Sequence, residues 1–196
     1  MIEDLPLFPL HAVLFPEGRL PLRIFEQRYL GMVKTCLREE APFGVCLIRQ
    51  GKEVGAPATP EDVGCLARLA NWDMPQLGVL QVVARGSQRF RILERCVQAD
   101  GLARARVETI GADTDAAVPD SYRACVSLLE HLIERQASLF ERPYRLDSAS
   151  WVSARLAEIL PVSLVAKQKM LELDDGVARL ETLHRFLARH RPASGR

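Results

Sequence analysis

A serine and a lysine lie four residues apart in the second half of the chain, at Ser163 and Lys167. On a helix this spacing places two side chains on one face, and a serine beside a lysine can serve hydrolases as nucleophile and base. Ser163 also stands where a helix is predicted to begin, so that its hydroxyl can cap the first amide groups while Lys167 stays solvated. We prefer capping, because the chain leaves no residues to build a peptidase domain.

Nucleotide and metal chemistry lack their motifs as well. A phosphate-binding loop needs spaced glycines before a lysine and a hydroxyl residue after it, and Gly51-Lys52-Glu53 has neither. The histidines do not cluster in sequence with acidic residues or cysteines, and the cysteines form no C-x-x-C pair; these residues are His11, His131, His184 and His190, and Cys36, Cys46, Cys65, Cys96 and Cys125. We therefore predict no enzyme activity, no catalytic residue, no metal site and no cofactor.

Two groups of residues suit binding instead. Glu26, Arg28 and Tyr29 stand at the entrance of a predicted helix, and Trp72 and Met74 lie in a predicted connection between strands. Exposed aromatic and methionine side chains suit adaptable binding to unfolded chains. A structural interpretation is also open for both groups: the charges can favour the helix start with Tyr29 packed, and the tryptophan can fold back onto the barrel rim.

Arginines form the third candidate. Alternation along the predicted strand 88–96 puts Arg89, Arg91 and Arg95 on one side, and in 102–110 Arg104 and Arg106 share a side. If the two strands pair, five arginines converge on one face that could bind RNA. Against this, the residues up to Asp115 contain 14 Lys and Arg and 15 Asp and Glu, a net charge of −1, and the face lacks aromatic residues for base stacking. Nucleic acid is therefore the less favoured partner.

The elements that must position these residues change type once along the chain. Prolines and large apolar residues predict a buried extended segment at the start, then one helix and five further strands, with Gly111 to Pro119 as a connector. The expected elements are strand 5–15, helix 23–40, and strands near 43–49, 63–71, 78–85, 88–96 and 102–110. Residues 71–78 are expected to form a hairpin connection.

Helical periodicity replaces the strand pattern after the connector. We predict helices over 119–141, 148–160, 163–173 and 175–190, with Pro143 ending the first. Ser148 or Ser150, Ser163, and Asp174 or Asp175 are the expected N-caps. Four amphipathic segments joined by short links predict a small four-helix bundle.

Composition agrees with an ordinary globular protein. The 196 residues have a net charge of +1, are 48% hydrophobic and 26% charged, and contain no apolar run long enough to cross a bilayer. Acidic Glu3 and Asp4 stand where a signal peptide would carry basic residues, so we expect a cytoplasmic protein with no membrane partner. The oligomeric state cannot be read from the sequence.

Several motifs together resemble one family, the N-terminal substrate-binding domain of Lon proteases. Its opening strand, turn and helix entry are similar to LPLFPL, LFPEG and LPLRIFEQRY at 5–10, 14–18 and 20–29. Further similar segments are DVGCLARL at 62–69, with Cys65 where threonine is usual, RGSQRFRI at 85–92, LPVS at 160–163 and KQKMLE at 167–172. The resemblance extends over roughly residues 5 to 187.

This resemblance implies an α+β fold with two subdomains. Residues 1–115 would form a six-stranded, PUA-like β pseudo-barrel carrying one helix, and residues 116–196 a four-helix bundle packed against it. The implied function is a non-catalytic module that binds unfolded polypeptide or a protein partner and has a connection to proteolysis, with Glu26 and Arg28 at its binding face. RNA binding by a PUA-like module is the alternative.

Overall fold

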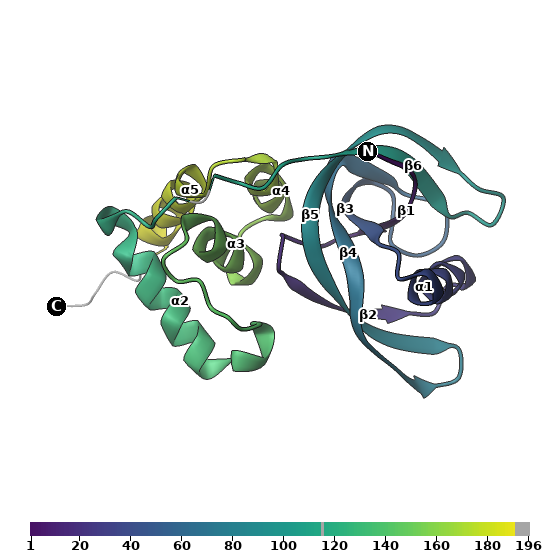
Figure 1. Ribbon diagram of the computed structural model, residues 1–196, viewed down its shortest axis with the longest axis horizontal. Coiled ribbons are helices and arrows are strands. Elements are labelled where there is room, and N and C mark those ends of the chain that lie inside the picture. The colour runs from purple at the N-terminus through teal and green to yellow at the C-terminus, as the bar shows by residue number, and fades with distance from the viewer. Residues whose placement is uncertain (115, 191–196) are drawn as a thin grey trace. The chain divides into compact units, whose positions relative to one another are not determined.

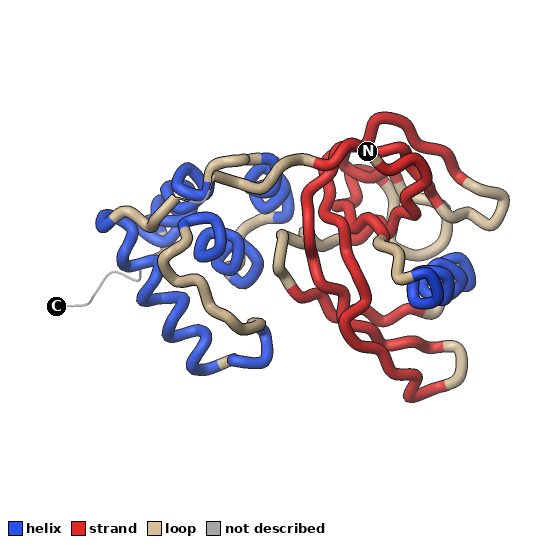
Figure 2. Tube along the Cα trace, viewed as in Figure 1, coloured by secondary structure: helices blue, strands red, loops and turns tan. Residues whose placement is uncertain are grey.

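The computed structural model describes residues 1–114 and 116–190. The chain divides into two compact units, Met1–Ala112 and Asp113–Arg196, and each is described here by itself. The first contains all the described strands and one helix, whereas the described part of the second is helical (Figures 1 and 2). The chain is therefore an α+β protein, as predicted, while the packing of one unit against the other stays a prediction.

Six strands and a helix build the first unit. They are β1 (Ile2–Leu10), β2 (Arg19–Ile24), α1 (Gln27–Glu39), β3 (Phe43–Gln50), β4 (Thr59–Gln76), β5 (Val79–Val97) and β6 (Ala103–Thr109). The sheet order is β2-β5-β4-β3-β1-β6, and β6 pairs with β5 as well as with β1. This extra pairing closes five strands into a ring, with β2 beside the first half of β5. Only β1 and β3 run parallel; the other pairs are antiparallel.

The interior of this barrel is filled by large side chains that meet glycines. Phe15, Phe43 and Phe90 are fully buried. A Cβ atom added to Gly44 or Gly64 would come within 2.7 Å of the Phe90 ring, so both strands need a glycine where they pass it. The apolar side chains of α1 recur on one face and pack into the hydrophobic cluster that contains Phe43.

Several boundaries differ from the sequence prediction in this unit: the expected strand 5–15 is observed as Ile2–Leu10, and the strand expected near 63–71 begins at Thr59. Residues 23 and 24 belong to a strand, because Leu20 to Ile24 pair with β5, and α1 begins only at Gln27. The segments expected as strands 78–85 and 88–96 are one continuous strand, β5. The expected connection 71–78 is itself paired as far as Gln76, and the turn is confined to Leu77 and Gly78, where Gly78 has a φ of 80°.

Four α-helices make up most of the described second unit. They are α2 (Arg123–Arg135), α3 (Ala149–Ile159), α4 (Leu164–Glu172) and α5 (Gly176–Arg189), with short 3₁₀ turns at Asp120–Tyr122 and Ala137–Leu139. The predicted N-caps are confirmed: Ser148, Ser163 and Asp175 accept hydrogen bonds from amide groups of the first helical turn. The α-helix predicted over 119–141 is shorter: 3₁₀ turns replace its two ends, and α2 stops at Arg135, well before Pro143.

Helix α3 is the most buried of the four and packs chiefly against α5, with α2 and α4 as its other neighbours. That these helices constitute a four-helix bundle stays a prediction. The predicted tail 192–196 lies outside the described residues. Within the described ranges, no helix is both long and apolar enough to span a membrane.

Candidate functional site

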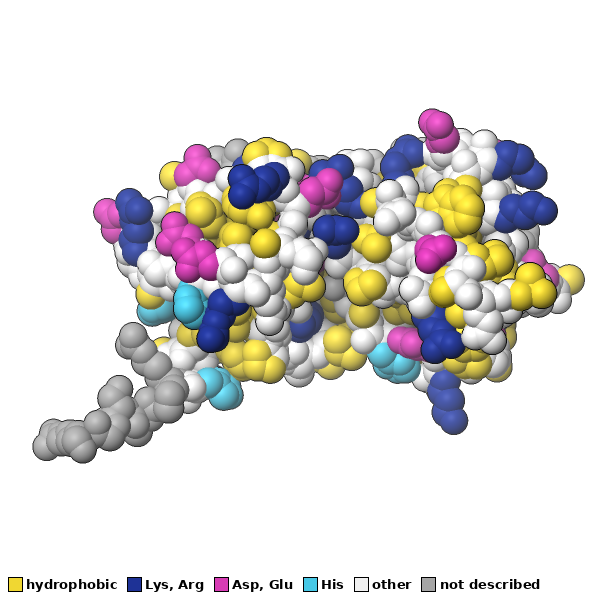
Figure 3. Space-filling model, turned by 90° about the horizontal axis from the view of Figure 1, so that it is seen from below, with side chains coloured by type: hydrophobic (Ala, Val, Ile, Leu, Met, Phe, Trp, Pro, Cys, Tyr) yellow, Lys and Arg dark blue, Asp and Glu magenta, His cyan; other side chains and the backbone are white. Residues whose placement is uncertain are grey.

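The far ends of β4 and β5 expose large apolar side chains. We call residues 69–83, with the turn at Leu77 and Gly78, the distal ribbon. Trp72, Met74 and Leu77 are 55%, 47% and 93% exposed. Hydrophobic side chains reach the surface of the first unit between charged ones on the face shown in Figure 3. Several exposed apolar side chains close together are typical of an interaction surface.

The strand register explains why Trp72 and Met74 share a face. Trp72 lies opposite Val82, and Val82 lies opposite Leu22 of β2. Residues opposite each other in an antiparallel pair project to the same face, so Trp72 lies on the face of buried Val82. Met74, two residues on, follows the same alternation. The apolar face of the sheet thus continues from the core onto the ribbon, beyond the area covered by α1.

The opposite face of the ribbon is polar. An open depression of about 340 Å³ lies over β2, β5 and β4, and residues of both alternating sets line it. Its lining residues are Pro21, Leu22, Arg23, Asn71, Trp72, Asp73, Gln81, Val82 and Val83. In register, Arg23 stands opposite Gln81 and Gln81 opposite Asp73. The ribbon therefore offers apolar contact on one face and hydrogen-bonding groups on the other.

The helix-entry residues make a compact internal cluster. Glu26 is the N-cap residue of α1 and accepts hydrogen bonds from Arg28 Nη2 (3.0 Å) and from the Gly55 amide (3.3 Å). Arg28 also donates to the Gly101 carbonyl (3.1 Å) and lies over the Tyr29 ring, 4.7 Å from its centroid. These contacts fasten two loops to the start of α1.

Tyr29 belongs to the core. It is 5% exposed and stacks on Phe8 with ring centroids 4.2 Å apart. Burial raises the pKa of its hydroxyl, Arg28 acts in the opposite direction and Glu26 adds to the rise. Of the helix-entry residues expected at a binding face, Arg28 and Tyr29 are buried and Glu26 is half-buried. The sheet places them near the ribbon, since Arg23 near the end of β2 lies opposite Gln81 and Gln81 lies opposite Asp73, so that Arg23 and Asp73 are two strand spacings, roughly 10 Å, apart.

The five arginines predicted for one face do not come together. Arg89 is buried and donates to the Gly111 carbonyl (3.3 Å). Arg95 lies opposite Ala105, so it projects to the other face from Arg104 and Arg106. A register shift between Ile92 and Glu94 causes this change of side.

The arginines that do share a face are accompanied by carboxylates. Arg104 is paired with Asp4 (2.7 Å), Arg106 with Glu94, and Arg91 stands opposite Glu108. Mixed charges of this kind form an ordinary solvated surface and give no strong positive field for a phosphate backbone.

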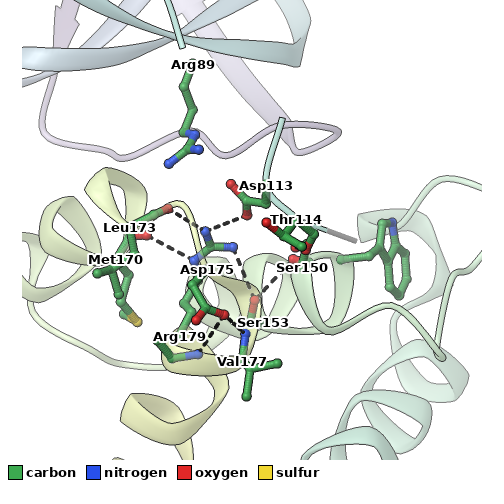
Figure 4. Close-up of polar contacts among 12 residues, drawn as sticks. Arg89, Asp113, Thr114, Ser150, Ser153, Met170, Leu173, Asp175, Val177 and Arg179 are labelled. Atoms are coloured by element: carbon green, nitrogen blue, oxygen red, sulfur yellow. Dashed lines mark hydrogen bonds and ion pairs between the residues drawn. The ribbon is translucent and has the colours of Figure 1, made fainter. Parts of the chain in front are cut away.

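The second unit holds a buried arginine that the sequence analysis missed. Arg179 is 2% exposed and donates to the carbonyls of Met170 (3.0 Å) and Leu173 (2.9 Å), to Ser153 Oγ (3.2 Å) and to Asp113 Oδ2 (2.7 Å) (Figure 4). Its neighbour Asp175 caps α5. Helical periodicity could have placed Arg179 near the inward face beside Leu180 and Leu183, but not its partners.

In the described chain, the residues considered for catalysis or metal binding make contacts that stabilise the fold or lie apart from one another. Ser163 caps α4 by accepting from the Ala166 amide (3.3 Å). Lys167 donates to the Glu158 carbonyl (2.8 Å), and burial lowers its pKa while Glu158 opposes the fall. Four cysteines are buried and Cys96 is exposed. Among residues 1–114 and 116–190, no three side chains of His, Cys, Asp or Glu gather as a metal site would require.

Comparison with known proteins identifies the family. The family described as the ATP-dependent protease La (LON) substrate-binding domain matches residues 4–189. The chain belongs to this family. Its sequence is 26% identical over 196 residues to the Lon protease of Anaeromyxobacter dehalogenans and 26% identical over 198 residues to Lon protease 2 of Myxococcus xanthus. These matches include 95% and 96% of this chain but only 23% and 24% of the proteases, so the chain spans about a quarter of their length.

Solved structures give the same assignment. The crystal structure of a Lon N-terminal domain protein from Xanthomonas campestris has a TM-score of 0.79 and 36% sequence identity, with 94% of this chain and 99% of that chain covered. The N-terminal domain of the Mycobacterium avium complex Lon protease has a TM-score of 0.68 at 15% identity, with 96% and 100% coverage, and shares the fold. Zebrafish (Danio rerio) cereblon is 26% identical over 113 residues, 56% of this chain.

Proposed function

We propose that this substrate-binding-domain protein binds extended, unfolded polypeptide segments through the distal ribbon. The observation that carries the proposal is the exposure of Trp72, Met74 and Leu77 within one short stretch of the ribbon. A flexible client loses conformational entropy on binding, so a few apolar anchors must supply most of the affinity. Tryptophan and methionine are suited to this role because they bury large areas and adapt to different partners.

The helix-entry cluster has a supporting role in this proposal. Glu26 and Arg28 hold Gly55 and Gly101 to the start of α1, and Tyr29 anchors that start in the core. The sheet that carries the ribbon is thereby fixed at the end of β2. Client contacts would come from the exposed side chains of the ribbon, with Glu26 at the margin.

We further propose that the chain itself neither hydrolyses ATP nor cleaves peptide bonds. Its sequence has no phosphate-binding loop. In the serine–lysine pair considered above, Ser163 caps a helix and Lys167 donates to the Glu158 carbonyl. The purified chain is expected to release no phosphate from ATP and no fragments from casein. Turnover that rises in proportion to added protein after further purification would contradict this proposal.

Fluorescence anisotropy with labelled, reduced and carboxymethylated lactalbumin tests the binding proposal. The double substitution Trp72→Ala with Met74→Ala is expected to weaken binding about tenfold or more, because it removes two anchors. Both side chains are exposed, so stability should change little. Leu93→Ala with Val97→Ala is the matched control, since both are exposed apolar residues at the end of β5, outside the ribbon. Equal effects of the two double variants would reject the ribbon as the binding surface.

The same assay separates polypeptide from nucleic acid. Apolar anchoring predicts a modest effect of salt, whereas RNA binding would weaken steeply as salt displaces phosphate contacts. A labelled single-stranded RNA is expected to bind poorly, because Arg104 and Arg106 are already paired with carboxylates. Salt-sensitive RNA binding that depends on Arg91 and Arg95, without binding of unfolded protein, would favour the alternative function.

A further inference from the structure

The sheet that carries the ribbon has two unpaired edges. Among the strands of residues 1–114, β2 pairs with β5 alone, and β4 pairs with β3 only as far as Ala67, so residues 69–76 of β4 have no paired strand on that side. An unpaired edge can accept another strand unless its donors are missing or blocked. The two edges differ in this respect.

The β2 edge is blunted by proline. The Gly86 amide donates to the Gly18 carbonyl (2.9 Å), which sets the phase of the β2–β5 ladder. Backbone groups alternate in direction along an antiparallel strand, so those of Leu20 and Leu22 point toward β5 and those of Pro21 and Arg23 point outward. Because proline has no amide hydrogen, the middle of this edge has no donor.

The β4 edge keeps its donors. Since Leu80 and Val82 of β5 face β2, Gln81 and Val83 must face β4, where their partners are Asp73 and Asn71. The amide groups of Trp72 and Met74 therefore point to the open edge. An independent observation agrees: the Trp72 amide donates to Asn71 Oδ1 and the Met74 amide to Asp73 Oδ1, each at 2.8 Å. Met74 and Pro75 both lie inside the register shift between Asp73 and Gln76, so the direction of the Met74 amide rests on its hydrogen bond to Asp73 Oδ1, and Pro75 removes neither donor.

We propose that an extended client segment binds by adding to β4 as a further strand. Its backbone carbonyls accept hydrogen bonds from the amide groups of Trp72 and Met74, and the side chains of Asn71 and Asp73 turn away. The two donors are two residues apart on a strand, about 6.8 Å, a repeat that the carbonyls of another strand match. This inference rests on the proposed function and states how the client is held.

The flanking side chains define the client further. On the face of Trp72 and Met74 the added strand gains from apolar residues at alternate positions. On the other face Asp73 is the only charged residue in the ribbon sequence, so a lysine or arginine opposite it is favoured and an acidic residue is not. The expected client is an extended segment that alternates apolar with polar or basic residues and lacks proline.

Backbone methylation of a defined peptide tests strand addition. The probe is a labelled nine-residue peptide that alternates valine or leucine with threonine and one lysine, with both termini blocked. Methylating the amides of one alternating set should lower affinity at least tenfold, because these amides pair with the carbonyls of β4, and methylating the other set should change it less than twofold. Equal behaviour of the two methylated peptides would overturn the inference.

Protein variants and amide exchange give a second measurement. Asn71→Ala with Asp73→Ala frees the two donors and should raise affinity a few-fold for a peptide with threonine in place of lysine, whereas Arg23→Ala at the β2 edge should have no effect. At saturating peptide, NMR should show slowed hydrogen exchange of the Trp72 and Met74 amides. Unchanged exchange at these amides would also overturn the inference.

The two proposals fail in different ways. If unfolded protein binds and the Trp72 and Met74 double variant weakens it, but methylation makes no difference, the ribbon is the site and strand addition is wrong. If the double variant binds as the unsubstituted chain does, the ribbon is not the site and both proposals are wrong.

Discussion

The distal ribbon exposes apolar side chains to solvent, whereas the second unit buries a charged side chain, Arg179. The ribbon leaves tryptophan, methionine and leucine side chains in solvent, with two edge amides each bonded to the side chain of the preceding residue. The Arg179 site encloses a full positive charge, with hydrogen bonds from Nε and both terminal nitrogens. The exposed groups of the ribbon remain available to a partner, whereas the hydrogen-bonding groups of Arg179 are bonded within the fold.

The difference separates binding from stability. A buried guanidinium is tolerated only when its hydrogen bonds and its charge are compensated, so the residues around Arg179 are expected to matter for folding. The exposed side chains of the ribbon contribute little to the core. Substitution should therefore affect stability in one region and client binding in the other.

The largest expected effect follows substitution of Arg179 itself. Arg179→Met removes the partner of Asp113 and of two helix-end carbonyls, and should lower the free energy of unfolding by about 3–5 kcal/mol. Urea unfolding followed by circular dichroism measures it. Arg185→Met is the matched control on the same helix, because Arg185 is exposed and its ion pair with Glu181 is long, at 4.0 Å. Almost no change in the free energy of unfolding is expected there. Similar losses in both variants would show that the Arg179 contacts are not stabilising.

A glycine at the base of the ribbon should give the next largest effect. A Cβ atom on Gly86 would lie 2.2 Å from the Phe15 carbonyl oxygen, so Gly86→Ala must displace backbone and should cost about 1–3 kcal/mol. Gly31 in α1 has open space around its Cα, and Gly31→Ala should stabilise the helix by about 0.5–1 kcal/mol. Opposite signs for the same substitution are the expected result in urea unfolding, and a loss at both positions would contradict it.

Substitution of the exposed cysteine should have the smallest effect on stability. The reaction rates of the thiols distinguish exposed from buried cysteines. Cys96 is exposed and should react quickly with Ellman's reagent, whereas Cys36, Cys46 and Cys125 are buried and burial raises the pKa of each thiol. Cys96→Ser should abolish the fast phase. Fast labelling that survives this substitution would show that a buried thiol is accessible.

These raised pKa values also predict how stability depends on pH. The unfolded thiols begin to ionise near their ordinary pKa of 9.0, while the folded ones stay protonated. The unfolded state then binds fewer protons than the folded state, so stability should fall as pH rises above about 9. Cys46→Ala should make this fall less steep in urea unfolding at several pH values. An unchanged slope would remove Cys46 as a contributor.

Local signals in the sequence determined a good part of this protein. The LPLFPL, RGSQRFRI and KQKMLE segments were sufficient to indicate the family that residues 4–189 match. Ser148, Ser163 and Asp175 were recognisable as caps, because a capping side chain bonds to amides two or three residues away. The change from strand to helical periodicity near residue 111 follows from the same short-range rules.

Tertiary structure alone decided the rest, because it depends on partners distant in sequence. Alternation within β5 suggested a row of arginines, but the register shift at Leu93 and the pairing with β6 dispersed it. The exposure of the Trp72 side chain depended on how far α1 reaches over the sheet. The direction of the Trp72 amide depended on the alternation of hydrogen bonds across β2, β5 and β4. The partners of Arg179 described above come from three separate segments, namely Asp113, α3 and the end of α4, and only folding brings a charge and its acceptors together out of water.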